Sequence, residues 1–499
     1  MLRPLVATTA VTAALILLAG CGGNDKKAES GNSNGQSSAS PTPTAPSIPE
    51  FDPPKAFTAA AAFPVSKVQT RDFYDSARAG MVGQVALVGH RDGLIGNNVA
   101  DPSKSWVVKS TAAETTTVSD VTAPVGVKVD GKDIAVVAYA EADKGNGTQK
   151  PQGLVLIQWI DVDSGQKLVE ISTPVSTVNG TGPTAQGTPN LQGLQYDPEN
   201  GQVAIGVGAD GNKTLFADPK TKKVTVIPGI VAAAVHDGVV AGSKVSSDRS
   251  NPDGTVVLAD GASGKITKQV PLKQRNLVPL AGGAKHAYFY GTVYKDNNYG
   301  GEDVASLFSV DLTTGAVVKS VPELSARDSS GYSCLWDEAS AIICRENAAT
   351  GHSEIFGFDD TTGKKAWGWT TKSGSRVVPD LGTAFHGVAY VQTEKKAVLL
   401  DANTGQDLPS GAPSGGPSES AGSTPSDGSS PTSGDTPSDG SSPSDGASAG
   451  GSDMSQYSGT QGSPDAVSRY GGVYTQTPQS SGYGSSELET ILVYLKPTA

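Results

Sequence analysis

The chain has 499 residues and a formal net charge of −12; 36% of its residues are hydrophobic and 18% are charged. An acidic surface of this kind disfavours nucleic acid and anionic lipid headgroups as partners. Any attachment to a membrane is therefore expected to be covalent rather than electrostatic.

A basic residue, Arg3, lies near the start of the chain, and an apolar run of about 13 residues follows at 6–18. This run is shorter than the roughly 20 residues that a membrane-spanning helix needs, so it indicates a cleaved export signal. Its end, with Leu18, Ala19 and Gly20 before Cys21, resembles the lipobox of bacterial lipoproteins.

That resemblance implies cleavage after residue 20, diacylglycerol on the sulfur of Cys21 and acylation of the new N-terminus. Two or three acyl chains hold a protein stably on a membrane where one does not. We therefore expect residues 1–20 to be a signal peptide and the protein to be lipid-anchored on the extracytoplasmic face of the cell membrane. An ordinary secretory signal followed by a coincidental cysteine is the alternative.

Residues 21–50 are rich in Gly, Asn, Ser, Thr and Pro and contain few apolar residues. Such a composition cannot bury a core and predicts a disordered tether. A flexible chain of this length spans about 30 Å on average, which would separate a folded domain from the membrane.

From residue 51 onward, an apolar strand followed by an Asp-initiated turn recurs seven times. An Asp side chain can accept backbone N–H bonds in a turn, and Gly four residues later supplies a positive φ. At two copies Lys222 and Ser105 replace this Gly, and we expect those turns to be less regular. A repeat of roughly 50 residues built from strands is typical of a β-propeller. The turns begin at Asp101, Asp161, Asp218, Asp260, Asp311, Asp359 and Asp401.

Each interval between these turns contains four short strands. In one interval they are predicted at 231–236, 239–245, 255–259 and 265–271. Short strands without a helical period indicate an all-β fold, and four strands per repeat make one propeller blade. We assign residues 51–408 to the main part of the propeller.

The copy that runs from Asp359 through Thr362 and Gly363 to Trp367 resembles the PQQ-like (quinoprotein-like) repeat. Enzymes of that family are quinone-dependent dehydrogenases with bound calcium, so the resemblance implies this activity as one possibility. The catalytic carboxylate and calcium ligands of those enzymes cannot be matched here residue by residue, and the chain lacks an adjacent cysteine pair. Five other copies have an aliphatic residue near the place of the Trp, namely Leu168, Val226, Val270, Val318 and Leu408.

Closure of the ring requires strands beyond the seven Asp turns. Residues 464–499 contain three predicted strands, at 465–470, 472–477 and 490–496, and a fourth is available near 57–65. Together they would form an eighth blade that removes the open edges of the ring. We expect eight blades, with seven as the alternative because the assignment of residues 66–98 is open.

Residues 409–463 are a Ser, Gly, Pro and Asp tract that predicts a disordered insertion. In a propeller the B–C and D–A connections share one face, and the A–B and C–D turns share the other. An N-terminal outer strand would therefore bring the tether to the A–B/C–D face. The tract and the longer loops, at 143–153, 248–254, 296–303 and 346–354, would then point away from the membrane.

Cys334 and Cys344 flank a predicted hairpin turn at 337–340. Opposite residues of an antiparallel pair come within disulfide range, so outside the cytoplasm we expect a cross-strand disulfide. Two free buried thiols are the alternative. A metal site would need more ligands than these two cysteines supply.

Two further groups are candidates for metal chemistry. His236, His286 and His386 recur at the same A–B turn in different blades, which separates them and favours structural roles. In the acidic loop after residue 295, Asp296, Asn298 and Glu302 could present oxygens to Ca²⁺, although their spacing does not match the twelve-residue calcium loop. We interpret this loop as solvated and expect no cofactor.

Gly-x-Ser-x-Gly occurs only at 31–35 and 446–450, inside the two low-complexity stretches, where no strand–turn–helix context is expected. The sequence has no His-Glu-x-x-His motif and no phosphate-loop motif in a suitable context. We therefore expect a non-enzymatic binding protein or scaffold in the cell envelope, with an envelope protein as its partner. A quinone-dependent dehydrogenase or another propeller enzyme is the alternative.

Overall fold

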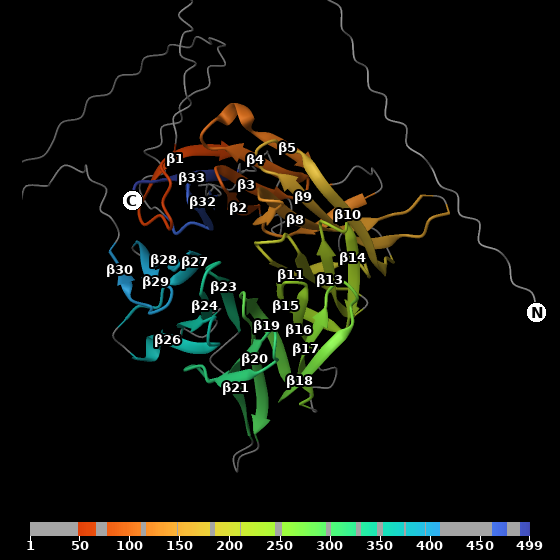
Figure 1. Cartoon of the computed structure of the whole chain (residues 1–499), viewed down its shortest axis with the longest axis vertical. Helices are drawn as coiled ribbons and strands as arrows, with labels where there is room; N and C mark the ends of the chain where they lie inside the picture. The colour runs from red at the N-terminus through yellow and green to blue at the C-terminus, as the bar shows by residue number, and fades with distance from the viewer. Residues whose placement is uncertain are drawn as a thin grey trace, which may run out of the picture. The chain divides into compact units, whose positions relative to one another are not determined.

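Eight small antiparallel sheets are arranged around a ring in the computed structural model of the chain (Figure 1). The structure describes residues 48–65, 77–110, 116–146, 148–179, 185–209, 211–244, 252–295, 301–325, 331–346, 353–373, 376–394, 396–409, 462–476 and 490–499. All of these belong to one unit, which runs from Ala45 to Ala499. The lipobox, Cys21, most of the tether and nearly all of the 409–463 tract lie outside the described residues.

The first four blades follow the chain in order. Blade 1 contains β2 (Arg78–Val82), β3 (Val85–His90), β4 (Gly93–Asn98) and β5 (Trp106–Lys109). Blade 2 contains β6 (Thr116–Val121), β7 (Val125–Val129), β8 (Lys132–Asp143), β9 (Gln152–Asp161) and β10 (Lys167–Thr177). Blade 3 contains β11 (Asn190–Tyr196), β12 (Val203–Gly208), β13 (Asn212–Asp218) and β14 (Lys223–Pro228). Blade 4 contains β15 (Ile230–His236), β16 (Val239–Lys244), β17 (Gly254–Asp260) and β18 (Ile266–Gln274).

Blade 2 has five strands because β6 and β7 both pair with β8, and the next three blades repeat the four-strand order of blades 1, 3 and 4. Blade 5 contains β19 (Asn276–Gly282), β20 (His286–Lys295), β21 (Glu302–Asp311) and β22 (Val317–Ser320). Blade 6 contains β23 (Tyr332–Trp336), β24 (Ala341–Glu346), β25 (Glu354–Asp359) and β26 (Lys364–Thr370). Blade 7 contains β27 (Asp380–Phe385), β28 (Val388–Gln392), β29 (Ala397–Asp401) and β30 (Asp407–Leu408).

The eighth blade joins the two ends of the chain. It contains β31 (Ala466–Ser468), β32 (Gly471–Gln476), β33 (Ile491–Pro497) and, as its outer strand, β1 (Phe57–Pro64). The register of β1 on β33 runs from Phe57 opposite Pro497 to Pro64 opposite Ile491, and β1 lies beside β33 in Figure 1. The predicted eight-bladed closure is confirmed, and the seven-bladed alternative is wrong because β2, β3 and β4 supply a blade from residues 78–98.

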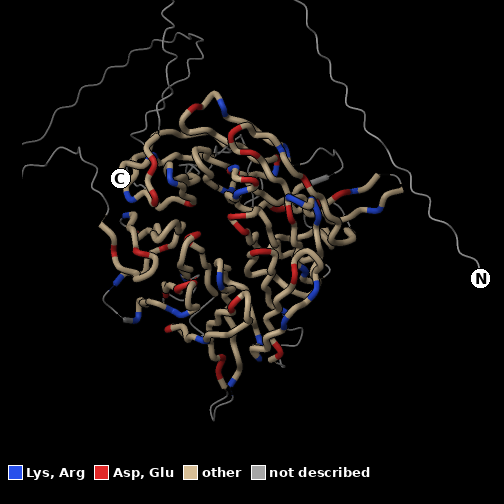
Figure 2. Tube along the Cα trace, in the orientation of Figure 1, with Lys and Arg blue, Asp and Glu red and all other residues tan. Residues whose placement is uncertain are grey.

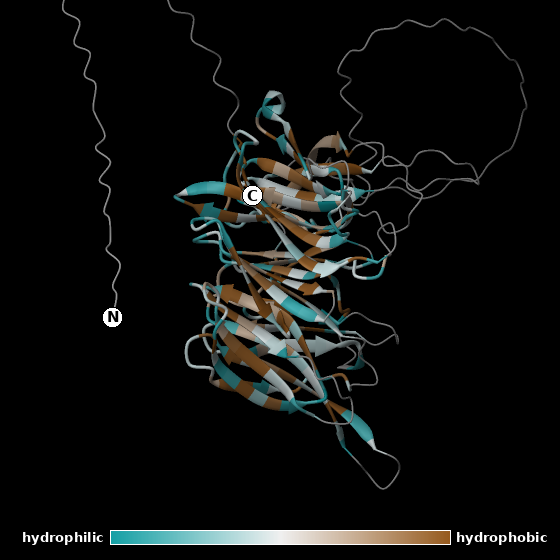
Figure 3. Ribbon diagram, turned by 90° about the vertical axis from the view of Figure 1, so that its right-hand side faces the viewer, coloured by the Kyte–Doolittle hydropathy of each residue, from teal (hydrophilic) through white to brown (hydrophobic). Residues whose placement is uncertain are grey.

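The hydrophobic cores lie between neighbouring blades. Strand residues are largely hydrophobic along the sheets, whereas the turns are hydrophilic (Figure 3). One core packs Val136 and Trp159 of blade 2 against Val203 of blade 3. Inner strands use small residues because they approach closely; a Cβ added to Gly282 would lie 2.3 Å from the Cβ of Ala234. The described residues contain two 3₁₀ segments, Pro102–Lys104 and Thr371–Ser373, and no helix in them is long and apolar enough to cross a bilayer.

The Asp turns form the C–D connections. At the turn after β9, Asp161 accepts hydrogen bonds from the backbone N–H and the hydroxyl of Ser164, and Gly165 takes a φ of 67°. Lys222 also takes a positive φ, 55°, and its N–H bonds to the Asp218 carbonyl at 2.9 Å, so the expected irregularity of this turn was wrong. Asp101 behaves as expected, since a 3₁₀ segment leads to an extended Ser105.

Two tryptophans pack outer strands onto the C–D turn of the next blade. Trp106 of β5 donates its indole N–H to the Val162 carbonyl at 2.8 Å and lies against Gly165, where an added Cβ would be 2.4 Å from the ring. Trp367 of β26 donates to the Ala402 carbonyl at 2.8 Å and packs against Gly405 in the same way. Glycine is required at both turns because the indole occupies the space of a side chain.

Candidate binding site at the mouth of the central channel

The A–B turns of six blades surround a cavity of about 390 Å³ at the centre of the ring, which we call the mouth. Its floor is apolar, with Met81, Val127 and Phe385, and its rim is charged. The lining residues are Glu50, Met81, Val82, Gly83, Gly126, Val127, Lys128, Asp133, Pro198, Glu199, Glu338, Phe385, His386, Val467, Ser468, Arg469 and Tyr470.

A second cavity of about 270 Å³, the inner chamber, is lined by inner-strand residues such as Ala281, Leu335 and Trp336. The two cavities share five lining residues and are therefore adjacent along the channel. The shared residues are Met81, Gly126, Glu338, Phe385 and Val467.

One hydrogen bond joins distant blades where the two cavities meet. The hydroxyl of Tyr196, at the end of β11 in blade 3, donates to Glu338 Oε1 of blade 6 at 2.5 Å. The Glu338 residue keeps an intermediate exposure to solvent, but it lies within the channel, where it lines both cavities. This burial raises the pKa of the Glu338 carboxyl, opposed by the Tyr196 hydrogen bond, and burial also raises the pKa of Tyr196. The pair narrows the channel with polar atoms.

An N-terminal segment, residues 48–54, lies across the A–B turns of blades 7 and 8; we call it the strap. Arg469 binds its two carboxylates, with Nη2 2.9 Å from Asp52 Oδ2 and Nη1 3.4 Å from Glu50 Oε1. The Phe51 N–H donates to the Arg469 carbonyl at 2.9 Å. His386 Nδ1 contacts Asp52 Oδ1, and burial together with Glu50 raises the pKa of Tyr470.

The strap places the beginning of the folded domain on the A–B/C–D face. This agrees with the face expected from the sequence for entry of the tether. The Tyr390 hydroxyl donates to the Pro54 carbonyl at 2.7 Å, and the N–H groups of Lys55 and Ala56 donate to the Ala499 carbonyl. Residues 54–56 thus fix the strap beside the point where the ring closes.

Charged residues of both signs are interspersed around the ring (Figure 2). In the mouth, Lys128 pairs with Asp133 in blade 2, two blades along the ring from the Arg469 cluster of blade 8. Glu199 and Glu338 add two carboxylates from blades 3 and 6. The mouth therefore presents cations at two places, each already paired with a carboxylate of the same chain.

The three A–B histidines occupy separate blades, as expected. His236 Nδ1 lies 3.4 Å from Asp197 Oδ2, and this contact raises the pKa of His236. His286 is buried, and its Nδ1 lies 2.6 Å from the Asp360 carbonyl. His386 contacts the strap. Within the described residues no group of three or more His, Cys, Asp or Glu could hold a metal ion.

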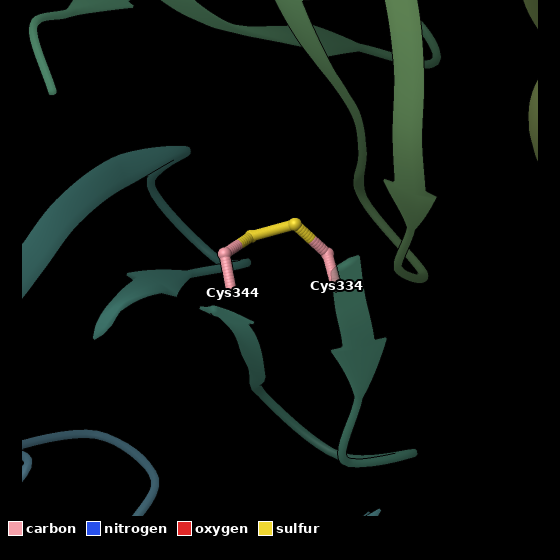
Figure 4. Close-up of a disulfide and its surroundings, with 2 residues drawn as sticks. All are labelled: Cys334 and Cys344. Carbon is pink, nitrogen blue, oxygen red and sulfur yellow. A yellow bond between two sulfur atoms is a disulfide. The ribbon is translucent and has the colours of Figure 1, made fainter. Parts of the chain in front are cut away.

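Cys334 and Cys344 form the predicted disulfide, which joins β23 to β24 (Figure 4). The two residues are directly opposite each other in the antiparallel register. Cys344 is fully buried, and Cys334 lines the inner chamber. The disulfide therefore links the channel wall to the interior of blade 6.

The other proposed site residues are not brought together in the described part of the chain. Asp296 and Asn298 lie outside the described residues, and Glu302 begins β21 opposite Lys295. Of the expected outward loops, 143–153 is described except for residue 147, whereas residues 248–251, 296–300 and 347–352 of the other three lie outside the described residues.

Sequence reasoning missed Arg469 and the strap acids, because their contact joins residues more than 400 positions apart. The signal available was the A–B position of Arg469 and Tyr470, which matches that of the three histidines. Trp106 was also missed. It directly follows the degenerate Asp101 turn, whose missing glycine hid the likeness to the copy ending at Trp367.

No protein-family profile and no curated protein sequence matches the chain. The Dos1 propeller is similar in structure at 9% identity over 70% of this chain and 86% of that one, with a TM-score of 0.41. A prolyl endopeptidase matches at 15% identity over 69% of this chain, with a TM-score of 0.37; this chain spans 49% of its length. The propeller domain of the Trilobed protease from Pyrococcus furiosus matches at 13% identity, covering 60% of this chain and 84% of that one, with a TM-score of 0.35. Likeness at this level concerns the propeller fold alone.

The quinone implied by the PQQ-like resemblance does not fit the inner chamber. That cofactor carries several carboxylates, whereas the charged residues lining the chamber are Glu338 and Asp465, with no Lys or Arg among the described lining residues. Like charges in a confined site repel and disfavour ionisation. No reaction step is assigned through such a group.

Proposed function

We propose that the protein is a lipid-anchored, extracytoplasmic binding protein or scaffold that holds an envelope protein. The observation that carries this proposal is the mouth, where charged side chains from several blades converge on a cavity beside the strap. Converging polar groups around a largely preformed cavity are typical of a binding site. The lipobox-like sequence ending at Cys21 supports the anchoring, and the disulfide supports an oxidising compartment.

Two faces could hold the partner. The sequence favours the loop face, because its longer loops point away from the tether, whereas the described cavity lies on the opposite face. In-cell crosslinking followed by mass spectrometry separates these arrangements. One variant would have the four long loops shortened, and the other would carry Arg469→Gln. We expect a partner to be captured by the unchanged protein and lost in one of the two variants.

Capture of the same partner by both variants would contradict recognition through either face. Absence of any specific partner would contradict the scaffold function.

The anchor has its own test. Replacing Cys21 by Ala removes the sulfur that would carry diacylglycerol, so we expect the protein to leave the membrane fraction. Replacing Cys334 and Cys344 by Ser is the matched control, since it removes the sulfur atoms of the other two cysteines and leaves Cys21 in place. Retention of the Cys21→Ala protein on membranes would overturn anchoring at this residue.

A further inference from the structure

We propose that the mouth recognises an acidic peptide segment and that the strap is its built-in occupant. The inference rests on the proposed binding function and names the chemistry of the partner. Peptide segments bound to a protein surface combine backbone hydrogen bonds, which contribute affinity, with side-chain contacts, which contribute specificity. The strap uses both kinds of contact at one residue.

Arg469 makes the contacts that would read such a segment. Its guanidinium binds the carboxylates of Glu50 and Asp52, two residues apart, and its carbonyl accepts the N–H of the residue between them. Guanidinium groups suit carboxylates because their N–H donors form a rigid fork. His386 adds a second contact to Asp52. The recognised pattern is therefore an acid, any residue, and a second acid.

The strap can leave without opening the ring. The side chains of Glu50 and Arg469 are 50% and 48% exposed, and ion pairs at this exposure contribute little. The ring is closed by β1 on β33 and by the bonds of Lys55 and Ala56 to Ala499, which lie beyond the strap. Release of residues 48–52 would uncover Arg469 and His386 at the edge of a cavity that the strap does not fill.

A peptide segment from another molecule competes with the strap for Arg469, and the strap is favoured because it is part of the same chain. A short linker holds the strap at an effective concentration of about millimolar, so a free peptide of equal intrinsic affinity does not displace it below that level. The net charge of −12 further opposes an acidic ligand at long range. A partner confined to the same membrane surface would overcome both effects.

The test uses a labelled synthetic peptide that copies residues 47–54 and the detergent-solubilised full chain. In the variant Glu50→Gln/Asp52→Asn the strap loses both acids. We expect this variant to bind the peptide at least about tenfold more tightly than the unchanged chain. Adding Arg469→Gln should reverse the gain. Lys132→Gln is the matched control, because it removes a 69% exposed cation on the same face outside the cavity.

Equal binding of a peptide with Gln and Asn in place of its acids would overturn the inference, as would equal effects of Arg469→Gln and Lys132→Gln. A second measurement needs no variant. Hydrogen exchange at the Phe51 amide of the unchanged chain should accelerate when the acidic peptide is added at millimolar concentration. No change there would also overturn the inference, whereas the crosslinking result would stand independently.

Discussion

Blade 6 and blade 8 have the same four-stranded order but are held together differently. Blade 6 is continuous in sequence, and the Cys334–Cys344 disulfide joins its first two strands. Blade 8 is assembled from both ends of the chain, and its outer strand is attached through the β1–β33 ladder and the bonds to Ala499. Blade 6 is therefore held by a covalent crosslink, whereas blade 8 depends on hydrogen bonds between strands from the two ends of the sequence.

The contacts that each of these two blades makes with the next blade in the ring also differ in number. Asp337, fully buried at the A–B turn of blade 6, accepts N–H bonds from Ala339, Ser340 and Ala341, and from Gly387 of blade 7. At the corresponding turn of blade 8, the Ser468 hydroxyl donates a single bond to the Gly83 carbonyl of blade 1 at 2.8 Å. The comparison indicates that closure of the ring relies on buried strand residues rather than on turn contacts.

Deleting residues 490–499 should have the largest effect. The deletion removes β33, whose residues Leu492, Val493, Tyr494 and Leu495 are at most 2% exposed. Burial of four such side chains contributes about 6–12 kcal/mol, comparable to the whole stability of a domain. We expect aggregation in size-exclusion chromatography. Deletion of 412–460, a tract with no core-forming composition, is the control and should change stability little. Soluble, cooperative unfolding of the first variant would refute closure through β33.

Asp337→Ala should destabilise the contact between blades 6 and 7 by about 3 kcal/mol, because it leaves one buried and three part-buried N–H donors without their acceptor. Chemical denaturation followed by circular dichroism measures this loss. Asp92→Ala, at an 89% exposed side chain, is the matched control. An equal, small effect of both substitutions would mean that the turn contacts of blade 6 matter no more than those of blade 8.

Replacing Cys334 and Cys344 together by Ser should lower stability by about 2–3 kcal/mol. A crosslink with a sequence separation of 10 restricts a short loop of the unfolded chain. Without reductant, the double variant should have a lower midpoint of guanidinium unfolding than the unchanged protein. Adding reductant should not change the midpoint of the double variant. A variant as stable as the oxidised protein would show that blade 6 does not need its covalent link.

Arg469→Gln should have the smallest effect on stability, below about 1 kcal/mol, because partly exposed ion pairs contribute little. The difference from the unchanged protein should shrink as salt is added, since exposed charges are screened. Thermal unfolding at two salt concentrations checks both points. A large, salt-independent loss would assign Arg469 and the strap to ring closure itself.

Local patterns explain why much of the fold could be predicted. Asp260 and Gly264 determine their turn through contacts within four residues, and the strand pattern on either side follows from alternation and length. The eighth blade could be predicted because its strands were left over after the seven Asp turns. Lys222 is an exception to the rule that Gly follows the turn Asp by four residues, because its backbone takes a positive φ although it is not glycine.

The mouth could not be predicted in the same way. Its residues come from A–B turns spread over six blades, and none of these turns has a motif of its own. The pairing of Asp52 with His386 joins residues 334 positions apart. Only the closed ring brings such residues together, so the cavity depends on the packing of the blades and not on any local pattern.

The bonds between residues 55–56 and Ala499 bear on how this protein can be labelled. A tag added after Ala499 would emerge on the A–B/C–D face, beside the strap and the mouth, where it would compete for space with whatever binds there. A tag placed within the 409–463 tract would begin from the D–A connection between blades 7 and 8, on the opposite face. Detection and purification therefore favour an internal fusion over a terminal one.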